Sequence, residues 1–114
     1  MNNEQKLIEK YLLPLAQNKE SLFLKNDAAY FKKQNLVIST DMMIEDKHFK
    51  KNIDPSLLAK KLVRINLSDI AAMGAVPDGI FLNIALPQLN VHDWFKAFTS
   101  GLKSDMKKFN LKLY

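Results

Sequence analysis

The first apolar positions of the chain recur at three- and four-residue intervals, the spacing of one face of a helix. The residues with this period are Leu7, Ile8, Tyr11, Leu12 and Leu15. Pro14 lacks an amide hydrogen and its ring crowds the preceding turn, so we expect it to end or bend this helix.

Two short runs of apolar and β-branched residues follow this helix. Residues 28–31 (Ala-Ala-Tyr-Phe) and 36–40 (Leu-Val-Ile-Ser-Thr) flank a polar turn of Lys, Gln and Asn. Two such runs separated by a short polar turn predict a β-hairpin.

A second helix is predicted to begin at Asp54-Pro55. Asp is a favourable N-cap, and Pro is tolerated at the first helical position because its missing amide hydrogen would have no partner there. The apolar period then continues to about Met73, and Gly74 is a suitable residue to end the helix.

The last third of the chain predicts a turn, a strand, a helix and the start of another strand. Residues 77–79 (Pro-Asp-Gly) form the turn, and the mostly apolar run 80–86 predicts a central strand that Pro87 ends. Asn90 is the expected N-cap of a helix with a long apolar and aromatic stripe, and residues 111–114 begin a strand-like run. The stripe consists of Val91, Trp94, Phe95, Phe98, Leu102, Met106 and Phe109. This order of elements predicts an α/β or α+β fold.

Composition limits the classes of protein to consider. The 114 residues are 47% hydrophobic and 25% charged, which suits a single globular domain over 1–114 with one core. The formal net charge of +5 permits an anionic ligand such as a phosphate, a nucleotide or a nucleic acid, but does not require one.

Several kinds of site are excluded by composition. Cysteine is absent, which excludes disulfides, thiol nucleophiles and Cys-based zinc or iron–sulfur sites. The chain has 2 histidines, His48 and His92, too few for a multi-histidine metal site within one chain. No apolar run resembles a signal peptide or a membrane span, so we expect a soluble cytoplasmic protein that does not bind membranes.

Glycine-rich phosphate loops do not fit this chain. Gly74 and Gly79 have the outer spacing of a P-loop, but Ile80-Phe81 follow in place of Lys-Ser/Thr and a strand follows in place of a helix. The 3 glycines of the chain, Gly74, Gly79 and Gly101, do not have the spacing of a dinucleotide fingerprint. Phosphates would therefore have to be held another way, for which the main candidate is Mg²⁺ bound by carboxylates.

Two aspartates lie at the ends of the predicted hairpin. Asp27 precedes the first strand, and Ser39-Thr40-Asp41 end the second. Antiparallel pairing places these ends side by side, so we expect Asp27 and Asp41 to lie close together. The alternative is that both aspartates only terminate strands and turns.

Asn66 and Asp69 are polar positions in a stretch that is otherwise mostly apolar. They share a helix face at a spacing of i, i+3. We expect the stretch 65–76 to be buried on most sides, where a carboxylate must be hydrogen-bonded, paired or bound to a metal. A hydrogen-bond network in the core and a metal site are both open at this point.

The histidines and lysine pairs carry weaker signals. His48 lies in a charged loop, where a solvated histidine and a functional one are both open, and His92 is expected on the surface. The pairs Lys50-Lys51, Lys60-Lys61 and Lys107-Lys108 predict solvated faces and are not interleaved with exposed aromatics, as single-strand binding would need.

Several strings along the chain resemble bacterial thiamine-monophosphate kinase. The most specific is Asn66–Ala75 (NLSDIAAMGA), preceded by Ser39-Thr40-Asp41, Glu45 and His48-Phe49. The resemblance extends to Leu7–Leu12, Asp27–Ala29, and Ala85–Pro87 with the Trp94 helix, and so covers essentially the whole chain. It implies the N-terminal domain of the aminoimidazole ribonucleotide synthetase-like superfamily, with a mixed sheet and helices packed on one face.

The resemblance also implies an activity and a set of site residues. The activity is ATP-dependent phosphorylation of thiamine monophosphate to thiamine diphosphate, with Mg²⁺, by direct in-line transfer. The implied Mg²⁺ ligands are Asp27, Ser39, Thr40, Asp41 and Asp69. Of these, Asp27, Thr40, Asp41 and Asp69 would also bind ATP, and His48 would contact the substrate. No acid, base or nucleophile is implied, and the expected assembly is a homodimer whose strands pair across the interface.

Two departures from the family pattern modify these expectations. Lys25-Asn26 stand where the family has Gly-Asp, so one carboxylate is missing and a lysine is added. Beyond Tyr114 the family continues into a Gly-Gly-Asp-Thr segment and a C-terminal domain, so we expect the isolated chain to lack kinase turnover. The alternatives are a truncated, non-catalytic nucleotide-binding or dimerisation module and a small basic nucleic-acid binder, which only the charge favours.

Overall fold

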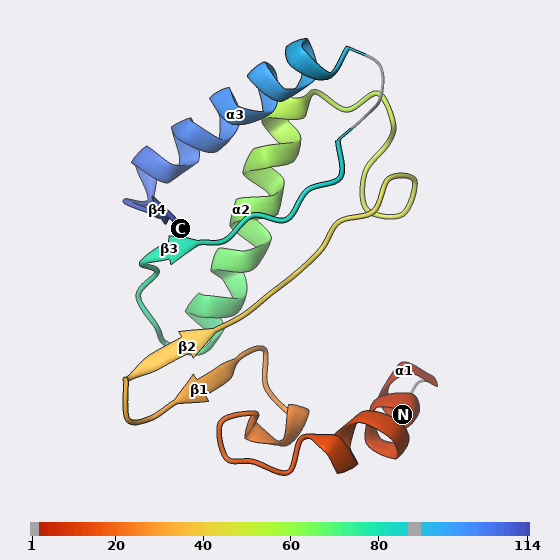
Figure 1. The fold of residues 1–114 in the computed structure, drawn as a ribbon, viewed down its shortest axis with the longest axis vertical. Helices are drawn as coiled ribbons and strands as arrows, with labels where there is room; N and C mark the ends of the chain where they lie inside the picture. The colour runs from red at the N-terminus through yellow and green to blue at the C-terminus, as the bar shows by residue number, and fades with distance from the viewer. Residues whose placement is uncertain (1–2, 87–89) are drawn as a thin grey trace. The chain divides into compact units, whose positions relative to one another are not determined.

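The computed structural model describes residues 3–86 and 90–114, which fall into two compact units. The first unit comprises the chain up to Thr40 together with Asp69–Ala75, and the second comprises Asp41–Ser68 with Val76–Tyr114. Helix α2 (Pro55–Ala72) contributes residues to both units (Figure 1). Pro87, the predicted end of a strand, lies outside the described residues.

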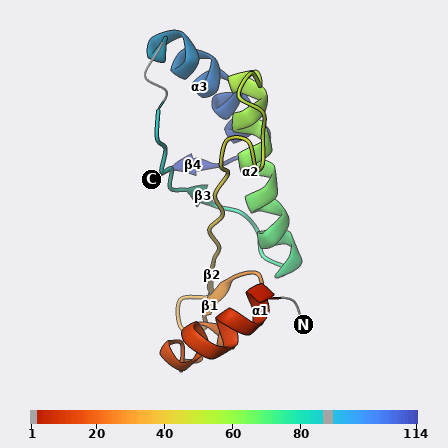
Figure 2. The same cartoon turned by 90° about the vertical axis from the view of Figure 1, so that its right-hand side faces the viewer.

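The first unit begins with the predicted helix, in three segments. Helix α1 (Asn3–Leu7) continues into a π-helical turn, η1 (Ile8–Leu12), and then a 3₁₀ turn, η2 (Leu13–Leu15) (Figure 2). The helical period is confirmed, and Pro14 lies in the last, tightened turn, as expected of a residue without an amide hydrogen. None of these residues is buried.

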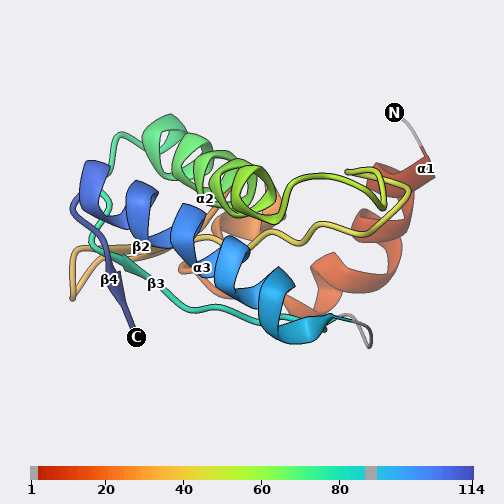
Figure 3. The ribbon, with the colours of Figure 1, turned by 90° about the horizontal axis from the view of Figure 1, so that it is seen from above.

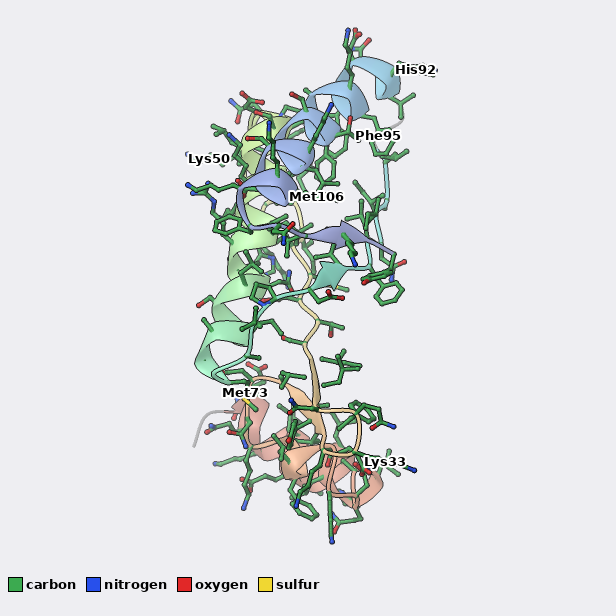
Figure 4. All side chains as sticks on the ribbon, turned by 90° about the vertical axis from the view of Figure 1, so that its left-hand side faces the viewer. Lys33, Lys50, Met73, His92, Phe95 and Met106 are labelled. Carbon is green, nitrogen blue, oxygen red and sulfur yellow. The ribbon has the colours of Figure 1, made fainter. Side chains whose placement is uncertain are left out.

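The predicted hairpin is confirmed. After a short 3₁₀ turn, η3 (Leu22–Leu24), strands β1 (Ala29–Phe31) and β2 (Leu36–Ile38) pair antiparallel, with Tyr30 opposite Val37. Lys33 lies at the turn (Figure 4), which Asn35 closes at φ 51°, a conformation that asparagine tolerates better than most residues.

The second unit is built on two helices, α2 up to Ser68 and α3 (Val91–Lys108), which lie side by side (Figure 3). Its buried apolar residues are Leu58, Ala59, Val63, Phe98, Leu102 and Leu111. Gly101 lies directly on the backbone of Ser56, so an added Cβ would collide there and only glycine allows the helices to approach this closely. The predicted stripe of α3 is confirmed as core, although Phe95 at its edge is 36% exposed.

The predicted helix ends of this unit are confirmed with one difference. The Asp54 carboxylate accepts a hydrogen bond from the Ser56 amide at 2.9 Å, as expected of an N-cap. Asn90 is the N-cap of α3, but its side chain makes no capping hydrogen bond, and only its carbonyl accepts from Trp94. At the other end of α2, within the first unit, Gly74 has φ 67° and ends the helix as predicted.

The prediction of a central strand over 80–86 is wrong. The strand β3 (Gly79–Ile80) pairs in parallel with β4 (Lys112–Leu113), as Figure 2 shows, and residues 81–86 form no regular structure. A strand needs a neighbour for its backbone hydrogen bonds, and β4 supplies one for two residues only. Phe81 is consequently 87% exposed. The predicted mixture of helices and strands is confirmed, with one antiparallel and one parallel pair of strands.

The expected burial of residues 65–76 is also wrong. The buried residues of α2 are Leu58, Ala59 and Val63, all in its first half. Ala71 and Ala72 are exposed, and Val76 is 89% exposed. An apolar pattern identifies side chains that could be buried, but burial requires a packed neighbour.

In the part of the chain that the structure describes, no helix is both long and apolar enough to cross a bilayer.

Candidate functional site

The first unit brings Asp27, Ser39 and Asp69 together. The Ser39 hydroxyl oxygen lies 3.1 Å from the backbone carbonyl oxygen of Asp27 and 3.4 Å from Oδ2 of Asp69. The first contact follows from the hairpin, because antiparallel pairing aligns the start of β1 with the end of β2. The second joins residues 30 positions apart. One hydroxyl proton serves one acceptor at a time, and the carbonyl is the closer of the two.

A shallow depression of about 260 Å³ lies beside this contact. Its polar lining consists of Ser21, Asn26, Asp27, Ser39 and Thr40. Asp27 and Thr40 are exposed, so their oxygen atoms are available to a ligand. Carboxylate, hydroxyl and amide oxygens are the donors that Mg²⁺ prefers, so the chemistry of this lining fits the predicted ion.

Asp41 belongs to the second unit, although it follows Thr40 directly in the chain. Its Oδ1 accepts a hydrogen bond from the Met42 amide at 2.8 Å. Among residues 3–86 and 90–114, no three acidic or imidazole side chains form a group that could hold a metal ion. The structure thus joins Asp69 to the Asp27 end of the hairpin, and the wider ligand set with Thr40 and Asp41 stays a prediction.

The two polar residues of α2 have different environments. Asn66 donates from Nδ2 to the Leu62 carbonyl at 2.9 Å, so its side chain is engaged within its own helix. Asp69 is half-buried, and its carboxylate faces the Ser39 hydroxyl in the first unit. Asn66 and Asp69 therefore have separate hydrogen-bond partners and are not joined in one network. Asp69 is only partly buried, and its carboxylate lies beside the end of the hairpin.

His48 lies in an exposed loop of the second unit. Its Nδ1 accepts a hydrogen bond from the Ile44 amide at 2.9 Å, and its carbonyl accepts one from Nζ of Lys61 at 2.6 Å. His92 lies exposed in the first turn of α3, at the end of the helix shown in Figure 4, as predicted. His48 therefore has structural partners that His92 lacks among the described residues.

The second unit also contains an ion pair that was not predicted, in which the carboxylate is buried and the arginine is half exposed. Asp105 is 1% exposed and accepts hydrogen bonds from Nε of Arg64 at 3.0 Å and from its Nη2 at 3.1 Å. The hydrogen bond and the negative charge of Asp105 both raise the pKa of the Arg64 guanidinium. The available signal was an acidic residue between Leu102 and Met106 on the apolar stripe. The pair is structural, because the Asp105 carboxylate is buried in the core.

A second unpredicted contact lies at the strand pair β3–β4. The Tyr114 hydroxyl donates to Oδ2 of Asp78 at 2.7 Å, and its ring contacts that of Phe81, with 5.8 Å between centroids. The hydrogen bond to Asp78 raises the pKa of Tyr114, and desolvation and the charge of Asp78 act in the same direction. This contact joins the turn before β3 to the residue after β4.

Comparison with known proteins gives a consistent set of relatives. Residues 25–114 match the sequence model of the family described as AIR synthase related protein, N-terminal domain. The thiamine-monophosphate kinase of Buchnera aphidicola subsp. Schizaphis graminum is 42% identical over 117 residues, which cover 97% of this chain and 36% of that protein. The enzyme of the same name from Escherichia coli K12 is 40% identical over 81 residues, 71% of this chain and 25% of that protein.

A solved structure supports the fold. The crystal structure of thiamine monophosphate kinase from Aquifex aeolicus matches with a TM-score of 0.75 and 24% identity, over 100% of this chain and 38% of that one. The predicted fold class is thereby confirmed. The chain spans between 25% and 38% of the length of these relatives.

Proposed function

The chain belongs to the AIR synthase related protein family, and we propose that it is the N-terminal part of an enzyme that phosphorylates thiamine monophosphate with ATP. The names of its relatives support this substrate, and the string Asn66–Ala75 is the most specific part of the sequence likeness to that family. The observation that carries the proposal is the contact of Ser39 with both Asp27 and Asp69.

The proposed ligands of Mg²⁺ are Asp27, Ser39, Thr40, Asp41 and Asp69. All of them offer oxygen atoms, the donor type that suits a hard divalent cation. Bound Mg²⁺ would neutralise and orient the phosphate oxygens of ATP. In this proposal the chain's own contribution is to hold the ligands, with Asp27 and Ser39 at the ends of the hairpin strands and Asp69 near the end of α2.

Phosphoryl transfer suits a site without an acid, base or nucleophile of its own. The transferred group passes through a loose transition state, and catalysis rests on positioning and on neutralising charge. The γ-phosphoryl group of ATP would pass directly to a phosphate oxygen of thiamine monophosphate, with ADP as the leaving group. In this proposal His48 contacts the acceptor substrate.

The chain spans only part of the length of the kinases that it resembles. We expect the isolated 114-residue chain to show no measurable turnover, because misplacement of reacting groups by about 1 Å can cost on the order of 10²-fold in rate. A coupled assay of ADP release, with thiamine monophosphate at high Mg²⁺, tests this expectation. Robust turnover by the chain alone would contradict it.

We further propose that the enzyme is cytoplasmic and homodimeric.

The nucleotide site is tested by Asp69→Asn, which removes the charge and keeps the shape. We expect weaker binding of Mg²⁺-nucleotide by isothermal titration calorimetry, with stability of the free chain preserved or raised because a half-buried charge is removed. The matched control is Asp93→Asn, an exposed aspartate in the first turn of α3. Loss of folding with unchanged nucleotide binding would favour a purely structural Asp69.

The alternative function is a non-catalytic nucleotide-binding or dimerisation module of the same family. Such a module should bind Mg²⁺-nucleotide in the same calorimetric experiment. It should support no turnover in the ADP-release assay, even when the rest of a kinase is supplied. Activity restored by adding the remaining part of a relative would exclude the module.

A further inference from the structure

The loop that carries His48 is anchored on the core of the second unit at both ends. Met43 and Phe49 are partly buried against the core cluster, and the residues between them are exposed. The Ile44 carbonyl accepts from the amides of both Lys47 and His48, and the Asp46 amide donates to the Phe49 carbonyl at 2.7 Å. The loop is therefore closed by its own backbone, and its tip is presented to solvent.

The imidazole of His48 is held by this backbone. The Ile44 amide can only donate, so Nδ1, which lies 2.9 Å away, must be the unprotonated nitrogen of a neutral ring. The proton then lies on Nε2, and no hydrogen bond joins Nε2 to any residue that the structure describes. The exposed edge of the ring consequently presents an N–H donor to solvent.

Lys61 ties this loop to helix α2. Its Nζ donates to the His48 carbonyl at 2.6 Å, across 13 positions of sequence. This charge-assisted bond restrains the His48 peptide group, and with it the direction in which the ring meets the Ile44 amide. The charged residues around His48 favour an anionic ligand, because the lysines outnumber the acidic residues. The lysines are Lys47, Lys50, Lys51 and Lys61, and the acidic residues are Glu45 and Asp46.

We propose that Lys61 and the Ile44 amide are positioning groups that hold His48 as an Nε2–H donor to a phosphate-ester oxygen. The identity of that ester, thiamine monophosphate, rests on the proposed function. The positioning of the ring does not rest on the proposed function, because it is a property of the chain without substrate.

Nuclear magnetic resonance of the ¹⁵N-labelled chain at about pH 8, where an ordinary imidazole is neutral, tests the positioning. With 2 histidines in the chain, His92 serves as the internal reference. We expect His48 to be protonated at Nε2 and to show a scalar coupling across the hydrogen bond from Ile44 N to Nδ1. Lys61→Met should weaken this coupling and speed hydrogen exchange of the Ile44 amide roughly two- to fivefold.

Two further variants separate positioning from general damage. Lys61→Arg keeps a cationic donor and should restore the coupling, whereas Lys103→Met removes the same charge from an exposed position of α3 and should change nothing at His48. Protonation at Nδ1 in the wild-type chain, or a coupling unaffected by Lys61→Met, would overturn the proposal.

The ligand is tested by adding thiamine monophosphate or, as control, thiamine. We expect the Nε2–H signal to move with the ester alone, and to require a several-fold higher concentration in Lys61→Met. Equal shifts with thiamine, or no shift with either, would refute the phosphate acceptor. Failure of the proposed kinase function would appear separately, as unchanged Mg²⁺-nucleotide binding in Asp69→Asn.

Discussion

The two units differ in how much of their apolar surface they bury. In the second unit, α2 and α3 enclose a core that includes Phe98 at 1% exposure and Ala59 at 0%. In the described part of the first unit, Ala28 is the one buried apolar residue, while Leu15 is 81% exposed and Leu7 57%. Both units contain ample apolar side chains, so composition does not explain the difference.

What differs is the supply of partners. Two long helices can bury one face of each other, whereas a short hairpin and one broken helix cannot. The candidate Mg²⁺ ligands Asp27, Ser39 and Asp69 lie in the thinly packed unit, and the His48 loop is anchored on the well-packed one. The second unit is therefore the better packed of the two.

The largest expected effect comes from emptying the packed core. Phe98→Ala removes a fully buried ring that stacks on Trp94, and we expect a loss of about 3–5 kcal/mol in the free energy of unfolding. Phe23→Ala, at a ring 43% exposed in the first unit, should cost far less. Urea denaturation measures both. Equal losses would show that the two units do not differ in packing.

A smaller loss is expected from the buried carboxylate of the second unit. Asp105→Asn keeps the shape but removes the charge that accepts both hydrogen bonds from Arg64, at a cost of about 1–3 kcal/mol. A double-mutant cycle with Arg64→Met should show that the two changes are not additive. Asp93→Asn is the exposed control. Additive effects would mean that the pair contributes nothing beyond its separate side chains.

In the first unit, the departure at position 26 predicts a gain of binding. Asn26 lines the depression beside Asp27, so Asn26→Asp adds a carboxylate oxygen there. We expect Mg²⁺ to bind roughly three- to tenfold more tightly, because ligand charge tunes the affinity for divalent cations. Asn35→Asp, at the hairpin turn, makes the same charge change away from the depression. If calorimetry shows equal gains in Mg²⁺ affinity for Asn26→Asp and Asn35→Asp, the gain comes from net charge and not from a new ligand in the depression.

The smallest effect concerns pH and the contact of Tyr114 with Asp78 in the second unit. The folded-state pKa of Tyr114 is raised above 10.0, so the contact stabilises the fold fully below that pH and is lost as pH rises through the folded pKa. Tyr114→Phe should therefore be slightly less stable than wild type near neutral pH, and the difference should vanish in strong alkali.

The tyrosinate absorbance of the Asp78→Asn variant provides the check. In this variant the absorbance of Tyr114 should appear at lower pH than in the wild-type chain, because the acceptor that holds the phenol proton has lost its charge. An unchanged titration would show that the hydrogen bond does not form in solution.

Local signals in the sequence determined most of the secondary structure. The helices α2 and α3 have the predicted ends, because Asp54, Gly74 and Asn90 each act on backbone groups within a few residues of themselves. The hairpin was predictable for the same reason, since its two strands and its turn are contiguous. The family resemblance named Asp27, Ser39 and Asp69 as Mg²⁺ ligands, and so implied that they lie together, but no local signal in the sequence predicted the contact between Ser39 and Asp69.

Tertiary structure alone decided what depends on distant partners. Residues 81–86 have the composition of a strand and no neighbour to pair with, and the far end of α2 is apolar and yet unburied. The pair Arg64–Asp105 spans 41 positions and the contact Ser39–Asp69 spans 30. Hydrophobic period and capping report the conformation of a segment, whereas burial, ion pairing and the meeting of ligands depend on which surfaces the fold brings within a few ångströms.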